Sequence, residues 1–176
     1  GPDMKLPPLG ALSLGARIAI SGEAETRGTS FGLLSGGGGA VVLRHVASLD
    51  APPQPDFVAV AERFLNVPYL WGGRTSLGVD CSGLVQLALA AAGHAVPRDT
   101  DQQAAAIGTS LGPDALDAPR RGDLVFWKGH VGIISDADTL LHASGYQMQV
   151  VAEPLRAALA RIAASAGPPV AVRRIG

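Results

Sequence analysis

The chain has 176 residues, a formal net charge of −1 and 47% hydrophobic residues. This length allows one main hydrophobic core and a small additional module. Binding to a phosphate backbone requires an excess of basic residues, which a near-neutral chain does not have, so we expect no nucleic-acid partner. No apolar run approaches the eighteen or so residues that span a bilayer, and the first thirty residues lack an export-signal pattern, so we expect no membrane span.

The 23 glycines and 13 prolines divide the chain into short elements, which favours a mixed α/β or α+β domain over a helical bundle. The first elements have the character of short strands separated by glycine and small polar residues. Their sequences are ALSLGARIAI, TSFGLL and GGAVVLRHVASL, all between residues 10 and 49. We therefore predict a small β module over residues 1–50.

A proline-rich connector follows this module. The stretch DAPPQPD ends at Asp56, which is suited to cap a helix, so we place a linker at residues 51–56 and a second domain at 57–176. Apolar residues at helical spacing predict a helix from Phe57 to Leu65, and a second helix should begin near Cys81 and stop at Gly93.

The rest of the chain is rich in β-strand patterns. After a polar segment at 98–112, four stretches predict an antiparallel meander: DLVFW, HVGIIS, TLLHAS and MQVVAE. Pro154 suits the first turn of a last helix that runs to about Ala164. The segment PVAVRRI then predicts a strand that closes the sheet.

Cys81 is the only cysteine, so it cannot form a disulfide within the chain. At the start of a helix, its thiol pKa is expected to be lowered by the unpaired N–H groups, which can also stabilise an oxyanion. The alternative is a small buried hydrophobic residue. The polar neighbours Asp80 and Ser82 favour a reactive thiol, and we predict that Cys81 is a nucleophile.

Two histidines can support such a nucleophile. His130 begins the apolar strand HVGIIS and is the best candidate for the base, while His142 is placed beside it by a hairpin that turns near residues 136–138. His142 is then able to orient the base. Both could instead be core histidines. A zinc site is disfavoured because no close ligand pair and no fourth ligand are evident, so we expect no metal and no cofactor.

Several motifs occur together in one order: PYLWGGRTSLGVDCSGLVQLAL, PRDTDQQ, RRGDLVFW, GHVGI and LLHA. In this order they resemble the NlpC/P60 family of bacterial cell-wall peptidases, from about Phe57 to the C-terminus. The resemblance implies a papain-like α+β fold and a cysteine peptidase. Its expected reaction is hydrolysis of the γ-D-glutamyl–diamino acid bond of peptidoglycan stem peptides.

The resemblance also implies roles for individual residues. Cys81, His130 and His142 are expected to be catalytic, with the Tyr69 hydroxyl near the oxyanion. Arg98 is expected to bind the free α-carboxylate of D-glutamate. The residues expected to bind substrate are Asp80, Ser82, Arg98 and Trp71. For Tyr69 and Trp71 the alternative is a place in the core, and for Arg98 a surface ion pair.

The front module resembles a bacterial SH3-type barrel, although SGGGGA replaces the aromatic positions that such barrels often show. In relatives with this arrangement the barrel favours stem peptides with a free N-terminal L-alanine, so we expect an enzyme of cell-wall turnover or recycling. We also expect the protein to be a monomer. Its compartment is open, either the cytoplasm or the cell envelope. The alternatives are an amidase, an acyltransferase, a peptidase that attacks another bacterium's wall, and a protein that binds wall peptides without cutting them.

Overall fold

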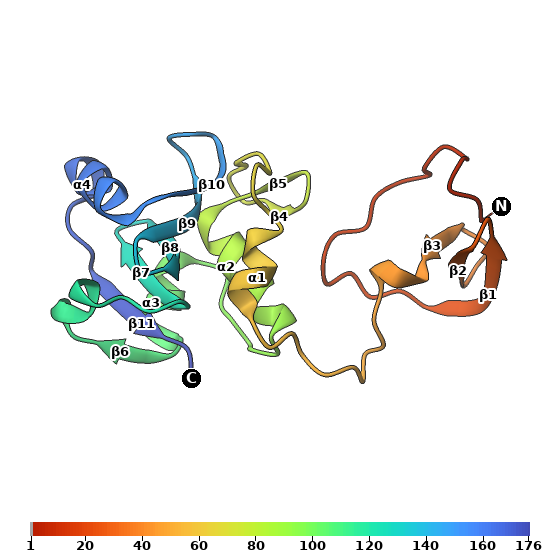
Figure 1. The fold of residues 1–176 in the computed structure, drawn as a ribbon, viewed down its shortest axis with the longest axis horizontal. Coiled ribbons are helices and arrows are strands. Elements are labelled where there is room, and N and C mark those ends of the chain that lie inside the picture. Colours follow the sequence, from red (N-terminus) through yellow and green to blue (C-terminus); the bar gives the residue numbers. More distant parts are fainter. Residues whose placement is uncertain (1) are drawn as a thin grey trace. The chain divides into compact units, whose positions relative to one another are not determined.

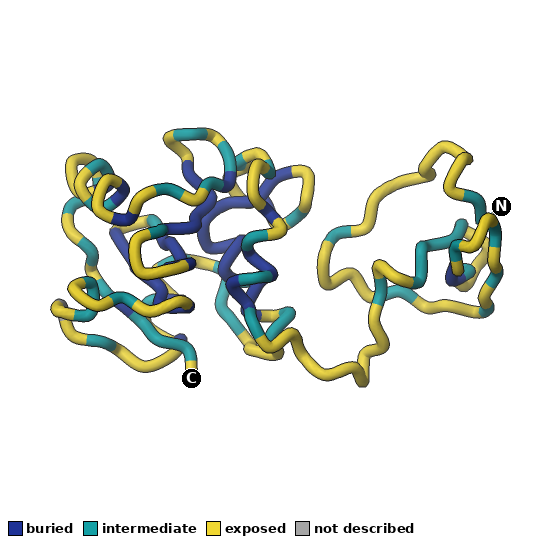
Figure 2. Tube along the Cα trace, in the orientation of Figure 1, coloured by how far each residue is buried: buried dark blue, intermediate teal, exposed yellow. Residues whose placement is uncertain are grey.

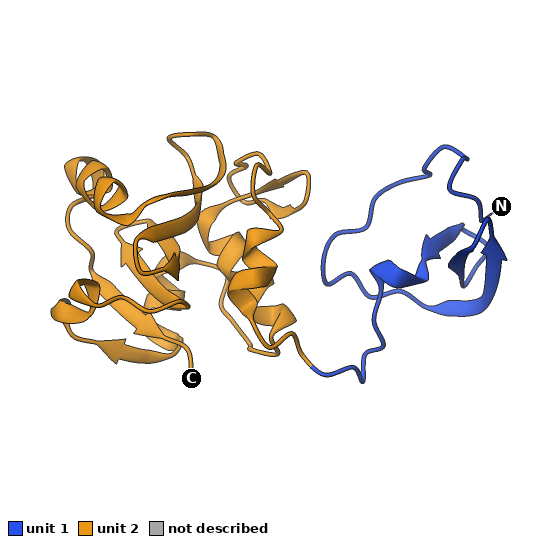
Figure 3. Ribbon diagram, viewed as in Figure 1, with its two compact units in different colours: residues 1–52 blue, residues 53–176 orange. Residues whose placement is uncertain are grey.

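A computed structural model describes residues 2–176, so Gly1 of the predicted module lies outside the described residues. The chain divides into two compact units, Gly1–Pro52 and Pro53–Gly176 (Figure 3). The division falls inside the segment predicted as the linker, residues 51–56.

The first unit contains one small antiparallel sheet in the order β1-β2-β3. Its strands are β1 (Ile20–Thr26), β2 (Thr29–Leu34) and β3 (Ala40–Val42), and the short 3-10 helix η1 (Leu43–His45) follows. Arg27 and Gly28 both have positive φ angles, 53° and 71°, as a tight hairpin between twisted strands requires.

The strand predicted from ALSLGARIAI is wrong except for its last residue. β1 begins only at Ile20, and the preceding residues form turns and irregular backbone. Gly15, in the middle of this stretch, has a φ of 82°, which interrupts extended backbone. The SH3-like character of the module stays a prediction.

The second unit is built on a six-stranded sheet in the order β10-β9-β8-β7-β11-β6 (Figure 1). Its strands are β6 (Thr109–Leu111), β7 (Asp123–Trp127), β8 (His130–Asp136), β9 (Thr139–Ser144), β10 (Gln149–Pro154) and β11 (Ala171–Arg174). All neighbouring strands are antiparallel. The predicted meander from β7 to β10 is thus confirmed, and β11 joins the sheet between β7 and β6.

Helices cover both faces of this sheet. They are α1 (Phe57–Glu62), α2 (Cys81–Ala91), α3 (Thr100–Ala106) and α4 (Leu155–Ala166); the 3-10 helix η2 (Pro113–Asp117) and the two-stranded β4 (Arg74–Thr75) and β5 (Gly78–Val79) lie in the connections. Successive side chains of β7 point to opposite faces of the sheet. Leu124 and Phe126 therefore pack against α1 and α2, and Val125 and Trp127 pack against α4. The core therefore forms two layers, one on each face of the sheet. Figure 2 shows the buried stretches of the second unit in dark blue. The α+β fold is confirmed.

The helix ends follow from local chemistry. Asp56 caps α1, as predicted, by accepting hydrogen bonds from the N–H groups of Val58 and Ala59 at 2.9 and 3.2 Å. The helix stops three residues earlier than predicted, before a turn in which Asn66 has a φ of 67°. Gly93, with a φ of 86°, follows the end of α2 as predicted.

Two features differ from the sequence-based expectation. The polar segment at residues 98–112, for which no helix or strand was predicted, contains α3 and β6. The sequence of α3, TDQQAAA, gives no helix signal because it lacks an apolar stripe of helical period. Pro154 ends β10 and is the residue before α4, not part of its first turn. Among residues 2–176, no helix is long and apolar enough to cross a bilayer.

Candidate active site

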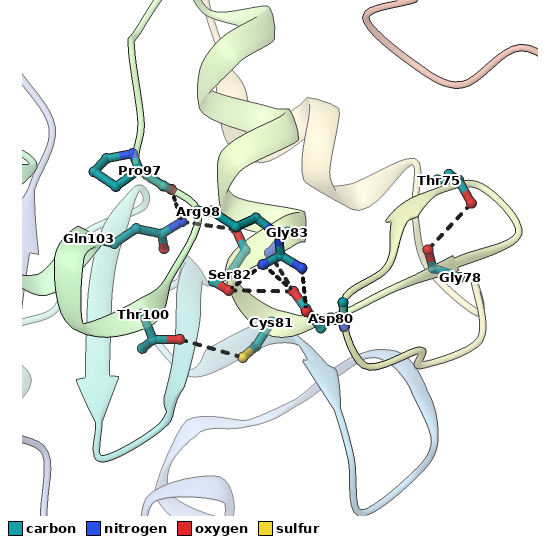
Figure 4. A network of polar contacts seen from close by, with 11 residues as sticks. Thr75, Gly78, Asp80, Cys81, Ser82, Gly83, Pro97, Arg98, Thr100 and Gln103 are labelled. Carbon is teal, nitrogen blue, oxygen red and sulfur yellow. Dashed lines mark hydrogen bonds and ion pairs between the residues drawn. The ribbon is translucent and has the colours of Figure 1, made fainter.

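Cys81 is the first residue of α2, and the side chain of Asp80 caps that helix. The Asp80 carboxylate accepts hydrogen bonds from the Gly83 N–H at 2.7 Å and from the Gly72 N–H at 2.8 Å. It therefore fixes both the start of the helix and the preceding loop. The thiol of Cys81 lies 4.0 Å from the hydroxyl of Thr100 and is only 5% exposed (Figure 4).

The expectation of a lowered thiol pKa is wrong for this structure. Burial raises the pKa of Cys81, and the negative charge of Asp80 adds to the effect. Hydrogen bonds from the Val131 N–H, the Thr100 hydroxyl and the Ser82 N–H oppose this rise without cancelling it. The desolvation of the thiolate thus outweighs the favourable helix start, and the sulfur carries its proton at neutral pH.

His130 and His142 form the hydrogen-bonded pair that the predicted hairpin implied. The hairpin turns between Asp136 and Thr139, and His130 Nε2 lies 2.7 Å from His142 Nδ1. The two rings meet edge to face, with centroids 5.0 Å apart. Since Nε2 of His130 is occupied by this bond, its Nδ1 is the nitrogen left for proton transfer.

Both histidines are neutral at pH 7. Burial lowers the pKa of His130 to about 3, and the neighbouring His142 and the positive charge of Arg161 act in the same direction. Burial also lowers the pKa of His142, although its hydrogen bond to Glu153 partly offsets the change. A neutral imidazole has a lone pair and can accept a proton, which a base must do.

Cys81 and His130 are brought together from different elements. Val131, the residue after His130, presents its N–H to the Cys81 sulfur, so the start of β8 lies against the start of α2. Among the contacts of residues 2–176, Cys81 has a hydrogen bond to Thr100 and none to His130 itself. The role of His130 as the base stays a prediction.

Three of the residues expected to bind substrate form one polar network (Figure 4). Arg98 donates to both carboxylate oxygens of Asp80, at 2.9 and 2.5 Å, and to the Ser82 hydroxyl at 2.8 Å. Burial would raise the pKa of Asp80, but the hydrogen bonds from Arg98 and from the Gly83 and Gly72 N–H groups hold it below its usual value. Any substrate carboxylate that binds Arg98 must therefore share it with Asp80.

A cavity of about 800 Å³ opens beside this network. Cys81 and Thr100 line it together with the 127–129 turn, and Trp71, 81% exposed, stands at its edge. The Tyr69 ring is half-buried. Burial raises the pKa of Tyr69, and the neighbouring Cys81 and Asp80 add to the rise. The place of the Tyr69 hydroxyl near the oxyanion stays a prediction.

Sequence reasoning did not assign roles to three residues of this region. Thr100, which contacts Cys81, lies in the PRDTDQQ motif two positions after Arg98. Glu153 hydrogen-bonds His142 Nε2 at 2.7 Å, and Arg161 of α4 donates to the same carboxylate. The alternation of β10 could have indicated Glu153 only once the register with β9 was known. Among residues 2–176, no three histidine, cysteine or acidic side chains gather as metal ligands.

Comparisons with known proteins match this architecture. The model of the NlpC/P60 family matches residues 66–161, more than half of the chain. A Bacillus subtilis protein named γ-D-glutamyl-L-lysine dipeptidyl-peptidase is 38% identical over 115 residues, which are 57% of this chain and 38% of that protein. The chain spans between about a quarter and two fifths of the first curated relatives it matches.

Solved structures share the fold. An NlpC/P60 family protein from Bacillus cereus has a TM-score of 0.70 and 23% identity, over 93% of this chain and 55% of that one. The peptidoglycan hydrolase RipB from Mycobacterium tuberculosis has a TM-score of 0.55 and 31% identity, over 68% of this chain and 62% of that one. The family predicted from the ordered motifs is confirmed: the chain belongs to the NlpC/P60 family.

Proposed function

We propose that the chain is a cysteine endopeptidase that hydrolyses the γ-D-glutamyl–diamino acid bond of peptidoglycan stem peptides. The observation that carries the proposal is the geometry of three side chains. Cys81 lies at the start of α2 beside the cavity, and the neighbouring sheet supplies His130 and His142 joined by a 2.7 Å hydrogen bond. A nucleophile, a base and an orienting group are the components that covalent acyl transfer requires.

In this mechanism His130 Nδ1 removes the proton of the Cys81 thiol as the sulfur attacks the γ-carbonyl carbon of D-glutamate. The backbone N–H groups at the start of α2 and the Tyr69 hydroxyl stabilise the oxyanion. The carbon–nitrogen bond breaks, His130 returns its proton to the leaving amine, and a thioester remains on Cys81. Water, activated by His130, then hydrolyses the thioester and restores the thiol.

The polar network beside Cys81 supports binding of a dipeptide that carries a positive amine and a negative carboxylate. Asp80 is an anion only 6% exposed and can attract the amine of a free N-terminal L-alanine. Arg98 keeps a partly exposed guanidinium, with 28% of its side chain accessible, for the α-carboxylate of D-glutamate. Ser82 and the exposed Trp71 complete the proposed substrate contacts.

The names of the relatives agree with this substrate class. The Bacillus subtilis relative is named for a γ-D-glutamyl bond, and RipB is a peptidoglycan hydrolase. The requirement for a free L-alanine depends on the front module, whose likeness to an SH3-type barrel is itself a prediction. We propose this requirement as part of the function and test it separately.

The test compares two peptides and two proteins. L-Ala-γ-D-Glu-diaminopimelate and its N-acetylated form are incubated with the parent and with Cys81→Ala, and products are identified by mass spectrometry. We expect the parent alone to release L-Ala-D-Glu, and only from the peptide with a free amine. Equal cleavage of the acetylated peptide would contradict the amine requirement, and no cleavage of either peptide would contradict the assigned bond.

A further inference from the structure

Behind the histidine pair lies a third hydrogen-bonded group, Glu153. Its Oε1 is 2.7 Å from His142 Nε2, on the side of the ring opposite His130. The His142 side chain is 1% exposed and that of Glu153 16%. Arg161 of α4 donates to the same oxygen of Glu153. Hydrogen bonds thus join four side chains in series, from the sheet to the last helix: His130, His142, Glu153 and Arg161.

The hydrogen-bonding capacity of these groups fixes where the protons lie. An oxygen that accepts from Arg161 belongs to a carboxylate, which can only accept, so His142 Nε2 must carry a hydrogen. In a neutral His142 ring, Nδ1 is then the acceptor. His130 must donate to it through Nε2–H, which leaves the lone pair of His130 on Nδ1.

We propose that Glu153 is a positioning residue, which sets the tautomer of His142 and through it keeps Nδ1 of His130 unprotonated for the Cys81 thiol. The inference rests on the proposed function, because it assigns a role within that catalytic site. Without the carboxylate, His142 can carry its proton on Nδ1 instead. His130 would then have to accept through Nε2 and carry its own proton on Nδ1, where it blocks proton transfer from sulfur.

The arrangement of charges supports this role. Burial lowers the pKa of both histidines, and the positive charge of Arg161 lowers them further. The carboxylate of Glu153 lies between Arg161 and His142 and opposes that effect, since its hydrogen bond raises the pKa of His142. The guanidinium carbon of Arg161 also lies over the ring of Tyr146, 4.9 Å from the ring centroid. Glu153 can therefore stabilise the imidazolium that forms during catalysis.

The competing explanation is that Glu153 only ties β10 to α4 through its ion pair with Arg161. Glu62 offers a matched control, because its carboxylate also pairs with an arginine, Arg121, at 2.8 Å, and it has no histidine partner within the described part of the chain. A purely structural ion pair would make Glu153 and Glu62 substitutions behave alike. A positioning role makes the histidine tautomers respond to Glu153 alone.

The first readout is independent of activity. The chain has only four histidines, so the ring nitrogens of ¹⁵N-labelled protein can be assigned by NMR with the help of His130 and His142 variants. We expect His142 to be protonated on Nε2 in the parent and in Glu62→Gln. We expect a substantial Nδ1–H population in Glu153→Leu and a smaller one in Glu153→Gln, which keeps an acceptor oxygen.

The second readout is kinetic. We expect kcat for the peptide to fall about 10- to 100-fold in Glu153→Leu with KM nearly unchanged, and to recover most of that loss in Glu153→Gln. In a His142→Asn background, whose side chain has no tautomers, Glu153→Leu should cost less than about threefold.

An unchanged His142 tautomer in Glu153→Leu would overturn the inference, as would an unchanged kcat despite a shifted tautomer. If Glu153→Leu does not fold, the spectrum of Glu153→Gln decides, and a parent-like spectrum counts against the proposal. A parent that cleaves no peptide would refute the proposed function, while the spectra would still show whether Glu153 sets the tautomer.

Discussion

The two sides of the site, the start of α2 and the sheet, differ in charge. At the start of α2, Asp80 and Arg98 form an ion pair beside the cavity, with part of the arginine exposed. On the sheet, His130 and His142 are neutral and linked by a hydrogen bond. Fixed charges thus lie where we propose that a charged peptide binds, and the proposed base is kept uncharged.

This difference also explains the raised thiol pKa. Desolvation disfavours charge on Cys81 as it does on His130, so the protonated thiol and the neutral imidazole are the stable pair. In the proposed mechanism, proton transfer between them accompanies attack on the substrate.

The largest effect is expected at the nucleophile. Cys81→Ala should lower kcat/KM by at least about 10⁴-fold, because no other group can form the thioester. The free energy of unfolding should change by only about 1 kcal/mol, since a single buried sulfur is lost. Peptide kinetics and urea unfolding measure the two quantities. Residual activity within about tenfold of the parent would mean that another group attacks the carbonyl.

On the sheet side, His142→Ala should lower kcat about 100-fold, because His130 loses the partner that orients its ring. The matched control is His94→Ala, since His94 is exposed and outside the cavity lining. The control should keep parental kinetics. Equal losses in the two variants would show that the histidine pair has no special part in the reaction.

On the charged side, the loss of Asp80 should have a large effect on the free energy of unfolding. Asp80→Ala removes a helix cap and leaves Arg98 without its partner, so we expect a loss of about 3 kcal/mol in the free energy of unfolding. Asp56 caps α1 and pairs with Arg121 in the same way, but its side chain is 46% exposed against 8% for Asp80. Asp56→Ala should therefore cost only about 1 kcal/mol. Similar losses in urea unfolding would contradict the difference in burial.

The most gradual effect is on the pH dependence of stability. Burial lowers the pKa of folded His130 from 6.5 to about 3, so between these values the unfolded chain binds a proton that the folded chain does not. Stability should therefore fall as the pH drops from 6.5 toward 3, with about 1 kcal/mol per pH unit from this residue. Urea unfolding of the parent and His130→Gln at about pH 7, 5.5 and 4.5 should give a shallower slope for the variant. Parallel slopes would indicate that His130 titrates normally.

The sequence predicted the local part of each side of the site. Cys81 and its neighbours Asp80 and Ser82 are adjacent along the chain, and the helix that begins there could be identified from its cap and apolar stripe. The hairpin that joins His130 and His142 also followed from strand patterns and one short turn. Both parts depend on local signals.

The missed features depend on tertiary contacts. Glu153 reaches His142 because β10 pairs with β9 in a register that places Val151 opposite His142, and sequence patterns do not fix that register. The raised thiol pKa does not follow from the sequence, because burial depends on the sheet that packs against α2. In the first unit, the apolar pattern of residues 11–20 predicts a strand, but the positive φ of Gly15 interrupts extended backbone there.

The most direct test of the central claim is to trap the intermediate. The parent and Cys81→Ala are mixed with L-Ala-γ-D-Glu-diaminopimelate, quenched in acid within one turnover, and examined by mass spectrometry of the intact chain and of its proteolytic fragments. The account predicts an L-Ala-γ-D-glutamyl adduct on the fragment that contains Cys81, absent from the variant. Peptide cleavage by the variant at the parental rate would contradict it.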